Sequence, residues 1–466
     1  MGESNEFEAM VVGGGIAGVA CAASLAIRDV RTLLVAETAL LGHNVRAVEV
    51  DGRRAQVQQV AWHFGWGGGH WLKVVREHNL PVPVHFALPI EASMRGLPGR
   101  NRLPIMVSAS ATADFLFRLL PVPVEPEQRR DLERVLQVGM MIPWEELCLL
   151  HDQPIGVWLD DQGAGELTRM VIELLAAVVA GLPRDAVSDT FSVFGIFCHI
   201  RTYFAGDGCF TLIEPDPQRG LIEPLGQQVE ALGGELWRGV KVDRVLVESG
   251  AVTGVQMTDG RVAHAPVVAL AAGNTRIPAY FDELPPELGA PLAKEARFKH
   301  QQLMVATVLD EPVVDTDENL FIHDPTTGAN IWMIPLHKAE PWQPTDGRQF
   351  ILQWWGGVSG DTTDPVAYMD DVFEEEFPGW KRAIGPRRRF DRKHHWLNPC
   401  YVGPKVPRRS PGIRGLFYVG ESTEPVAGIA SEQAAFAGYD GALTIASELG
   451  RTALGSPANL RVPAGI

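Results

Sequence analysis

A glycine pattern near the N-terminus constrains this sequence more than any other feature. Gly13, Gly15 and Gly18 have the spacing G-x-G-x-x-G and follow the apolar run Ala9–Val12. The small, proline-free residues that come next predict a helix, and the run RTLLVAE, which ends at Glu37, predicts a second buried strand. Because the pattern lies between a strand and a helix and another strand follows, it indicates a dinucleotide-binding βαβ unit.

Each glycine of this pattern has a physical role toward a bound dinucleotide. Gly13 permits the tight turn, Gly15 lets a pyrophosphate approach the backbone, and Gly18 lets the helix pack closely on the strand. Phosphate oxygens would meet the unpaired N–H groups at the helix start, around Ile16 and Ala17, and the positive end of the helix dipole. The alternative is a glycine-rich turn without a ligand.

The acidic residue at the end of the second strand narrows the choice of nucleotide. Glu37 lies 19 residues after the third glycine, where a carboxylate accepts hydrogen bonds from both hydroxyls of a ribose. An acid at this position disfavours a 2′-phosphate. The sequence therefore favours FAD or NAD over NADP.

A second segment near the C-terminus has the same succession of strand, turn and helix. Leu416–Val419 predicts a buried strand that Gly420 ends, and the small residues from Gly428 onward predict a helix that continues to Leu449. Taken together, the two segments resemble the FAD-dependent amine oxidase and phytoene desaturase superfamily. The likeness is closest to the phytoene desaturase form, through Gly420, Thr423, Pro425, Gly428 and Ile429, whereas Val426 and Ala427 replace two family glycines.

The resemblance implies that both segments bind one FAD molecule. The backbone N–H groups of Gly428, Ile429 and Ala430 would point at the pyrimidine edge of the flavin, where the helix dipole stabilises the anionic reduced ring. Glu421, which follows Gly420, would lie near the ribityl or pyrophosphate group.

Further contacts to FAD are implied by the same resemblance. Arg46, after Gly42, would place a cation near the pyrophosphate, and a solvated surface arginine is an equally good interpretation. Val242, with Val240, would line the adenine, although a valine buried in the core is the more common finding. Cys400 only vaguely resembles the covalent attachment segment of monoamine oxidases, so we expect a buried structural thiol and non-covalent FAD.

The predicted fold is α/β, with a doubly wound, Rossmann-like FAD-binding domain and an α+β substrate domain. The FAD-binding domain would be assembled from residues 1–95, 211–296 and 396–466. The substrate domain would comprise residues 96–210, which are mostly helical in pattern, and residues 297–395.

The resemblance implies an FAD-dependent oxidoreductase that removes hydride from a carbon atom of a hydrophobic small molecule. The reaction would be most like a desaturation of an isoprenoid or secondary metabolite, and the sequence assigns no catalytic residue. Because no second nucleotide pattern is present, the electrons would pass to oxygen or a quinone-like acceptor.

Two other activities remain open from the sequence, namely an amine or amino acid oxidase and a flavin-dependent double-bond isomerase. Related amine oxidases often place a lysine in the strand that matches QLMVATVLDEP, and here Met304 stands at that position. Lys299, five residues earlier, would lie on the other face of the strand. This departure makes the amine oxidase hypothesis less favoured.

Composition excludes some partners and compartments. With 41 basic and 57 acidic residues the net charge is −16, which argues against nucleic acid as a partner. The five cysteines lack metal-ligand spacing, so no metal is expected, and reduced thiols indicate a cytoplasmic protein. The longest apolar stretch, 170–182, is too short to span a membrane, and the basic run 386–393 leaves peripheral membrane contact as a minority alternative. The oligomeric state is not predicted.

One further prediction concerns the wall of the substrate site. The loop Gly65–Gly69 would approach the flavin from the substrate side. A pocket with aromatic walls, with core packing as the alternative, is predicted for Trp62, His63, Trp66, His70 and Trp71.

Overall fold

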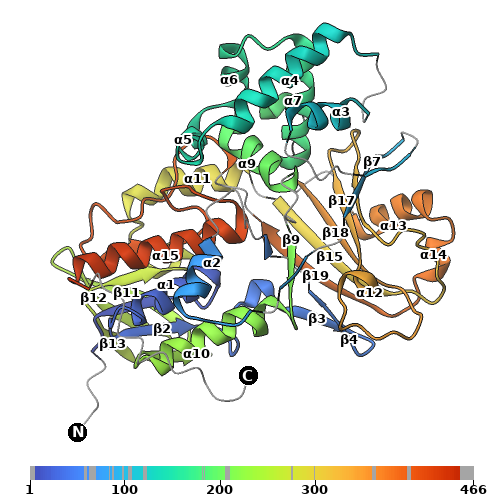
Figure 1. Ribbon diagram of the computed structural model, residues 1–466. Coiled ribbons are helices and arrows are strands. Elements are labelled where there is room, and N and C mark those ends of the chain that lie inside the picture. Colours follow the sequence, from blue (N-terminus) through green and yellow to red (C-terminus); the bar gives the residue numbers. More distant parts are fainter. Residues whose placement is uncertain are drawn as a thin grey trace.

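The computed structural model (Figure 1) describes most of the 466-residue chain. The described residues are 6–56, 60–61, 70–82, 84–86, 89–96, 99–102, 108–118, 123–180, 182, 184–204, 210–273, 276–298, 300–358, 364–395 and 400–451.

A five-stranded parallel sheet gathers four distant parts of the chain. Its spatial order is β10-β2-β1-β14-β20, and all four neighbouring pairs run parallel. Strands β1 and β2 are buried throughout, as expected for a parallel sheet covered on both faces. The strands are β1 (Ala9–Val12), β2 (Thr32–Ala36), β10 (Glu235–Arg238), β14 (Val268–Leu270) and β20 (Leu416–Tyr418).

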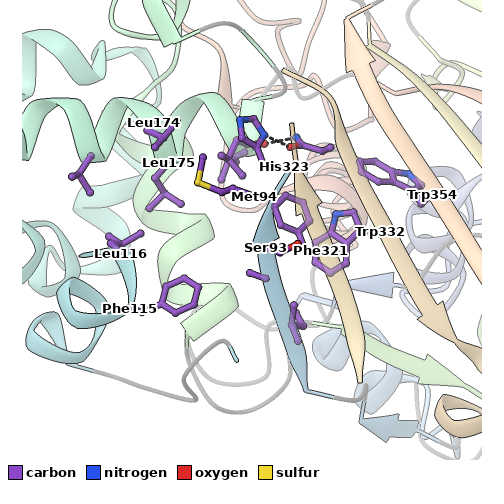
Figure 2. A pocket seen from close by; sticks show the side chains of 16 residues that line it. Ser93, Met94, Phe115, Leu116, Leu174, Leu175, Phe321, His323, Trp332 and Trp354 are labelled. Carbon is purple, nitrogen blue, oxygen red and sulfur yellow. Dashed lines mark hydrogen bonds between the residues drawn. The ribbon is translucent and has the colours of Figure 1, made fainter. Parts of the chain in front are cut away.

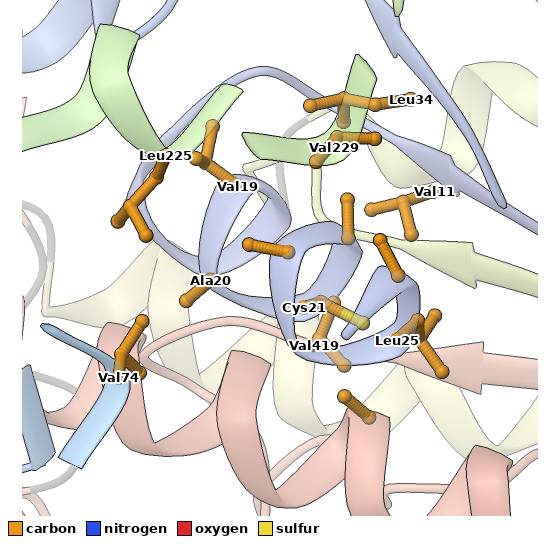
Figure 3. Close-up of a cluster of buried hydrophobic side chains, with 14 of the residues drawn as sticks. Val11, Val19, Ala20, Cys21, Leu25, Leu34, Val74, Leu225, Val229 and Val419 are labelled. Carbon is orange, nitrogen blue, oxygen red and sulfur yellow. The ribbon is translucent and has the colours of Figure 1, made fainter. Parts of the chain in front are cut away.

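Helices cover one face of this sheet and a second, small sheet covers the other. On the helical face, the side chains of Val11, Val19 and Val229 share one hydrophobic cluster (Figure 3). The opposite face packs on a three-stranded antiparallel sheet. The elements concerned are α1 (Ile16–Ala26), α2 (His70–Glu77), α10 (Glu223–Ala231), α15 (Ala430–Glu448), β11 (Val242–Glu248), β12 (Ala251–Met257) and β13 (Val262–His264).

A seven-stranded sheet forms the centre of the second half of the molecule (Figure 1). Its order is β19-β15-β18-β17-β16-β7-β8, and among the described pairs β16 and β7 run parallel while the others are antiparallel. Its strands are β7 (Ile90–Met94), β8 (Asn101–Arg102), β15 (His300–Val308), β16 (Asn319–His323), β17 (Asn330–Pro335), β18 (Phe350–Val358) and β19 (Arg388–His395).

Helices lie against both faces of the seven-stranded sheet. One face packs on α13 (Pro365–Glu376) and α14 (Trp380–Ala383) through apolar side chains such as Ile351 and Trp355. The helical part of the chain, which stands at the top of Figure 1, approaches the other face. It consists of α3 (Ala109–Arg118), α4 (Pro126–Met141), α5 (Trp144–Leu149), α6 (Ile155–Asp161), α7 (Glu166–Ala180), α8 (Arg184–Val187) and α9 (Val193–Phe204).

Shorter elements connect these layers. The strands are β3 (Ala47–Val50), β4 (Arg53–Gln56), β5 (Val60–Ala61), β6 (Val84–Phe86) and β9 (Phe210–Ile213). The helices are α11 (Gly289–Arg297) and α12 (Leu336–Ala339), with single turns η1 (His43–Val45), η2 (Leu150–Asp152), η3 (Gln218–Ile222), η4 (Ile277–Tyr280) and η5 (Pro286–Leu288). Among the helices described, none combines the length and hydropathy needed to cross a membrane.

Helices α1 and α15 pack without an intervening side chain at one point. A Cβ atom on Gly438 would overlap the carbonyl oxygen of Ala17, so this contact requires a glycine. Gly438 is the ninth residue of α15, and at about 1.5 Å of rise per residue the start of that helix lies about 12 Å beyond the contact. The packing therefore fixes where the two helix N-termini stand relative to each other.

Gly438→Ala is expected to lower the thermal unfolding midpoint, because the added methyl group must separate α1 from α15. Overpacking of this kind costs about 1–3 kcal/mol. Gly289→Ala is the matched control, since its Cβ would meet no heavy atom within 4 Å. Equal midpoints for the two variants, measured by circular dichroism, would contradict the packing argument.

Candidate functional site

The glycine turn between β1 and α1 leaves open space in front of the helix. A Cβ on Gly13, whose φ is +122°, would lie 2.7 Å from the carbonyl oxygen of Ala271, and one on Gly18 would overlap the carbonyl oxygen of Gly13. A Cβ on Gly15, in contrast, would meet no heavy atom within 4 Å. Gly13 and Gly18 are therefore required by packing, whereas Gly15 is not.

The start of α1 offers backbone donors to that open space. Gly15 is the N-cap and has no side chain that could cap the helix. The N–H groups of Ile16 and Ala17 in the first turn therefore have no partner within the helix. Such a terminus attracts anions through its N–H groups and its dipole. These donors suit the pyrophosphate of a dinucleotide, and contact with one stays a prediction.

Glu37 lies directly after β2, at the carboxyl edge of the parallel sheet. Its carboxylate forms a half-exposed ion pair with Arg276, with 2.5 Å between Oε2 and Nη1. Exposed pairs of this kind contribute little stability, so the carboxylate remains available to a ribose. Arg276 was not singled out from the sequence, because it follows β14 and carries no motif.

The segment that contains Arg46 is held against the glycine turn. The N–H of Gly42, whose φ is +70°, donates to the carbonyl of Gly14 at 2.7 Å. Arg46 then places one guanidinium nitrogen 2.8 Å from the imidazole of His43. Contact between Arg46 and a pyrophosphate stays a prediction.

Val242 opens β11 and is buried in the core beneath the main sheet, where it shares a cluster with Val12 and Val35. The backbone just before it is tied to the end of β2, because the N–H of Val240 donates to the carbonyl of Ala36 at 3.0 Å. The side chain thus has the packing role weighed from the sequence, and an adenine contact stays a prediction.

The loop between β20 and α15 is held in place by the side chain of Gln433. Its oxygen accepts from the N–H of Ala427 at 2.9 Å, and its amide nitrogen donates to the carbonyls of Thr423 and Pro425 at 2.9 and 3.1 Å. A Cβ on Gly428 would lie 2.9 Å from the backbone nitrogen of Gln433. A buried amide therefore fixes the loop that leads to the helix start.

A buried histidine from α2 braces the same loop. Nε2 of His70 donates to the carbonyl of Ala427 at 2.8 Å, and its backbone N–H donates to the Glu432 carboxylate at 2.8 Å. Burial lowers the pKa of His70 to about 4, so the ring is neutral at pH 7. His70 and Trp71 are thus packing residues, while Trp62, His63, Trp66 and the Gly65–Gly69 loop lie outside the described residues.

Helix α15 begins without a side-chain cap, as α1 does. Its N-cap is Ile429, and Ala430 adopts a positive φ of 46° at the first helical position. In the first turn of α15 the N–H of Glu432 donates to the carbonyl of Ile429 at 3.1 Å, and no side chain caps the helix. The arrangement fits the flavin contact predicted for Gly428, Ile429 and Ala430, which stays a prediction.

Glu421 follows Gly420 at the carboxyl edge of the sheet, in a buried cluster of titratable groups. Burial, together with the neighbouring Glu295, raises the pKa of Glu421 to about 8. The cluster also contains Lys294, whose pKa burial and Lys405 lower to about 7. The raised pKa favours the protonated form of Glu421 at pH 7, which would present a hydroxyl rather than a second negative charge toward a phosphate-bearing ligand.

Three residues around this cluster have metal-ligand chemistry. His151, Asp152 and Glu424 place one ligand atom each within 4.8 Å of one another. The ammonium group of Lys405, however, lies 2.7 Å from Oδ1 of Asp152 and supplies its counter-charge. This group is therefore an ion-paired cluster, and Cys400 beside it is a fully buried thiol, as expected.

A cavity of about 180 Å³ lies between the helical part of the chain and the seven-stranded sheet (Figure 2). Its helical wall comes from α3 and α7 and is aliphatic apart from Phe115, and its sheet wall includes the aromatic rings of Phe321, Trp332 and Trp354. None of the described lining residues carries a carboxylate or an ammonium group. The lining residues are Ile90, Ala92, Ser93, Met94, Phe115, Leu116, Val171, Leu174, Leu175, Val178, Val179, Phe321, His323, Asn330, Trp332 and Trp354.

Met304 stands at the position where related amine oxidases carry a lysine, and it neighbours Trp354 of the cavity wall. In β15 it pairs directly with Trp354 of β18, so the two side chains share one face of the sheet. Met304 is 3% exposed and packs with Val50 and Ala55. An apolar side chain therefore stands there, and the side chain of Lys299 lies outside the described residues.

No family model and no curated protein matches this sequence. Among solved structures, an oxidoreductase from Methanosarcina mazei superposes with a TM-score of 0.64 at 18% identity, covering 94% of this chain and 99% of its own. Cyclohexylamine oxidase from Brevibacterium oxydans gives 0.61 at 16% identity, covering 95% and 99%. A Rab GDI from Plasmodium falciparum gives 0.54 at 11% identity, covering 97% and 100%.

The chain thus shares the α/β fold of these solved oxidoreductases, which confirms the predicted fold class and, at the level of the fold, the resemblance drawn from its two glycine-rich segments. At these identities the comparison concerns the fold. The presence of a Rab GDI among the matches means that the activity must be argued from the site.

Glu421→Gln is expected to change how stability depends on pH. A carboxyl whose pKa is raised in the folded chain stabilises the fold when protonated, and this contribution disappears as the pH rises from about 5 to about 8. The FAD-free parent protein should therefore lose thermal stability relative to Glu421→Gln across that window. Glu127→Gln, at a site that is 91% exposed, should follow the parent. Parallel plots of thermal stability against pH for the parent and Glu421→Gln would refute the raised pKa of Glu421.

Proposed function

We propose that this protein is an FAD-dependent oxidoreductase that dehydrogenates a hydrophobic small molecule at a carbon atom. The observation that carries the proposal is the convergence of two uncapped helix N-termini, of α1 and α15, at the carboxyl edge of one parallel sheet. Ligands of open α/β sheets bind outside this edge. The open space at Gly15 supports a pyrophosphate in front of α1.

The start of α15 lies about 12 Å from Gly438, where α15 contacts the first turn of α1. This separation between the two helix starts supports a ligand as long as FAD rather than a mononucleotide. One helix would bind the pyrophosphate and the other the ring system. Glu37 would bind the adenosine ribose, and neutral Glu421 would donate to the ribityl or pyrophosphate oxygens. FAD would be held by these contacts without a covalent bond, because Cys400 is buried.

The cavity supports a hydrophobic substrate. Aromatic walls, such as those of Phe321, Trp332 and Trp354, exclude water and hold an apolar molecule by dispersion and burial of its surface. The protein would position one C–H bond within about 3–3.5 Å of the reactive nitrogen of the flavin.

Bound flavin supplies the hydride acceptor for this reaction. In a desaturation the substrate would lose a hydride from one carbon to the flavin and a proton from the neighbouring carbon to solvent, and the electron pair left by the proton would form the double bond. The two electrons would then pass to oxygen or a quinone-like acceptor, consistent with the absence of a second nucleotide pattern in the sequence.

Amine oxidation is the second candidate, and the likeness to cyclohexylamine oxidase favours it. The cavity argues against it in two ways. An ammonium group buried there would find no carboxylate among the described lining residues, and an unpaired buried charge is costly. Met304 also stands where related oxidases carry a lysine.

The cofactor proposal is tested by the Gly15→Val variant. The extended backbone at Gly15 (φ −81°, ψ −175°) and the free space around its Cβ accept valine without strain, yet the side chain would stand where the pyrophosphate binds. Parent protein should be yellow or be reconstituted with FAD, and Gly15→Val should lose at least about 100-fold in FAD affinity while folding normally.

Titration of flavin absorbance and fluorescence measures both proteins, and Gly289→Ala is the control that should retain FAD. A colourless parent that cannot be reconstituted would refute the proposal. So would a Gly15→Val variant that binds FAD as tightly as the parent.

The substrate proposal is tested by anaerobic reduction of the bound flavin. An acyclic polyprene should bleach the flavin spectrum under nitrogen, because the cavity accepts apolar molecules. Cyclohexylamine at pH 7 should bleach it more slowly. Bleaching by the amine alone would establish the second candidate instead.

A further inference from the structure

The imidazole ring of His323, a titratable group, forms part of the wall of the apolar cavity. It is the last residue of β16, it is 4% exposed, and Figure 2 shows its imidazole beside the aliphatic side chains of α7. Neither the glycine-rich segments nor the proposed flavin contacts involve this residue. Its chemistry therefore bears on what the cavity recognises.

The hydrogen bonds around His323 determine which ring nitrogen carries the proton. Nδ2 of Asn330 donates to the carbonyl of Val178 at 2.5 Å, which orients the amide so that its oxygen faces the histidine. Nδ1 of His323 lies 2.9 Å from that oxygen, Oδ1, and an oxygen at this position can only accept. Nδ1 therefore carries the hydrogen.

The other ring nitrogen, Nε2, then has a lone pair and no hydrogen. Burial lowers the pKa of His323, so the ring stays neutral at pH 7. In the described part of the chain Nε2 has no hydrogen-bond partner, and it is not among the polar atoms sealed from solvent. It is an acceptor that is accessible from the cavity.

The neighbouring carboxylate does not supply a partner for this nitrogen. Asp324 follows His323 on the opposite face of the strand, where its side chain accepts from Arg95 at 3.1 Å and from the hydroxyl of Tyr368. Its backbone partners include the N–H of Thr326. Asp324 is therefore fully engaged outside the cavity.

We propose that Nε2 of His323 recognises a hydroxyl group on an otherwise hydrophobic substrate. The donor of such a ligand must be neutral, because no described lining residue offers a counter-charge to an ammonium group. The inference rests on the proposed function in taking this cavity as the substrate site. It narrows the substrate class to hydrophobic alcohols, with Asn330 as the positioning residue that fixes the tautomer of His323.

Two isomeric probes test the acceptor. 1-Heptanol and methyl hexyl ether contain the same atoms, and the alcohol donates a hydrogen bond whereas the ether only accepts. The purified protein is expected to bind 1-heptanol about tenfold more tightly, since an unsatisfied acceptor and a lost hydrogen bond both disfavour the ether. Heptylamine, which is an ammonium ion at pH 7, should bind more weakly than 1-heptanol. Ligand-observed NMR titration measures all three affinities.

Variants assign the preference to His323. His323→Phe should bring the affinities for alcohol and ether to within about twofold of each other, because the acceptor is gone. His323→Gln should restore part of the preference through its side-chain oxygen. Met94→Leu is the matched control in the same wall, and it should change both affinities together without altering their ratio.

Equal affinities of the parent protein for the two isomers, or binding of neither, would overturn the inference. A preference that persists in a folded His323→Phe protein would also overturn it. Flavin binding is read separately from the visible spectrum. A colourless protein that still prefers the alcohol would refute the proposed function alone, whereas a yellow protein without the preference would refute the inference alone.

Discussion

The contact of α15 with α1 through Gly438 is the interaction on which the candidate site depends. It joins segments that lie more than 400 residues apart in sequence, and it brings two helix N-termini to one edge of a parallel sheet. Neither terminus is capped by its own side chains, so each presents backbone donors. A larger residue at this contact would separate the two halves of the proposed FAD site.

The parts of the fold that were predictable from sequence are those whose physics is local. Gly13 and Gly18 must be glycines because any Cβ there would meet the backbone. Their fixed spacing can therefore be recognised in the sequence. The strands of the main sheet are continuous apolar runs because both of their faces are buried.

The cavity proposed for the substrate was not predictable in this way. Its walls come from β7, α3, α7 and three strands of the seven-stranded sheet, and no short stretch of sequence contains its pattern. Trp332 and Trp354 lie in strands whose side chains alternate between the two faces of the sheet, and this alternation decides which rings enter the cavity. The domain boundaries predicted at residues 95, 210, 296 and 395 stay predictions, although β7 (Ile90–Met94) lies in the seven-stranded sheet.

The electrostatics of the two halves of the site differ in a way that suits different parts of a reaction. Around Glu421, burial and the neighbouring Glu295 raise the pKa of the carboxyl to about 8. Burial and Lys405 lower the pKa of Lys294 to about 7. Among the described residues that line the cavity, none is charged and one is a neutral imidazole, whose tautomer a neighbouring amide fixes. A polar, hydrogen-bonding region beside the sheet edge fits a cofactor rich in hydroxyl and phosphate groups.

An apolar cavity with an isolated acceptor fits a substrate that is recognised mainly by its shape and apolar surface. Burial of such a surface provides affinity without direction, because the hydrophobic effect is proportional to area rather than to orientation. A single hydrogen bond to a fixed nitrogen supplies the direction, since a misplaced hydroxyl leaves both partners unsatisfied. In a fold shared by proteins with different activities, we therefore expect the choice of substrate to depend on the few polar atoms of the proposed cavity, of which Nε2 of His323 is one.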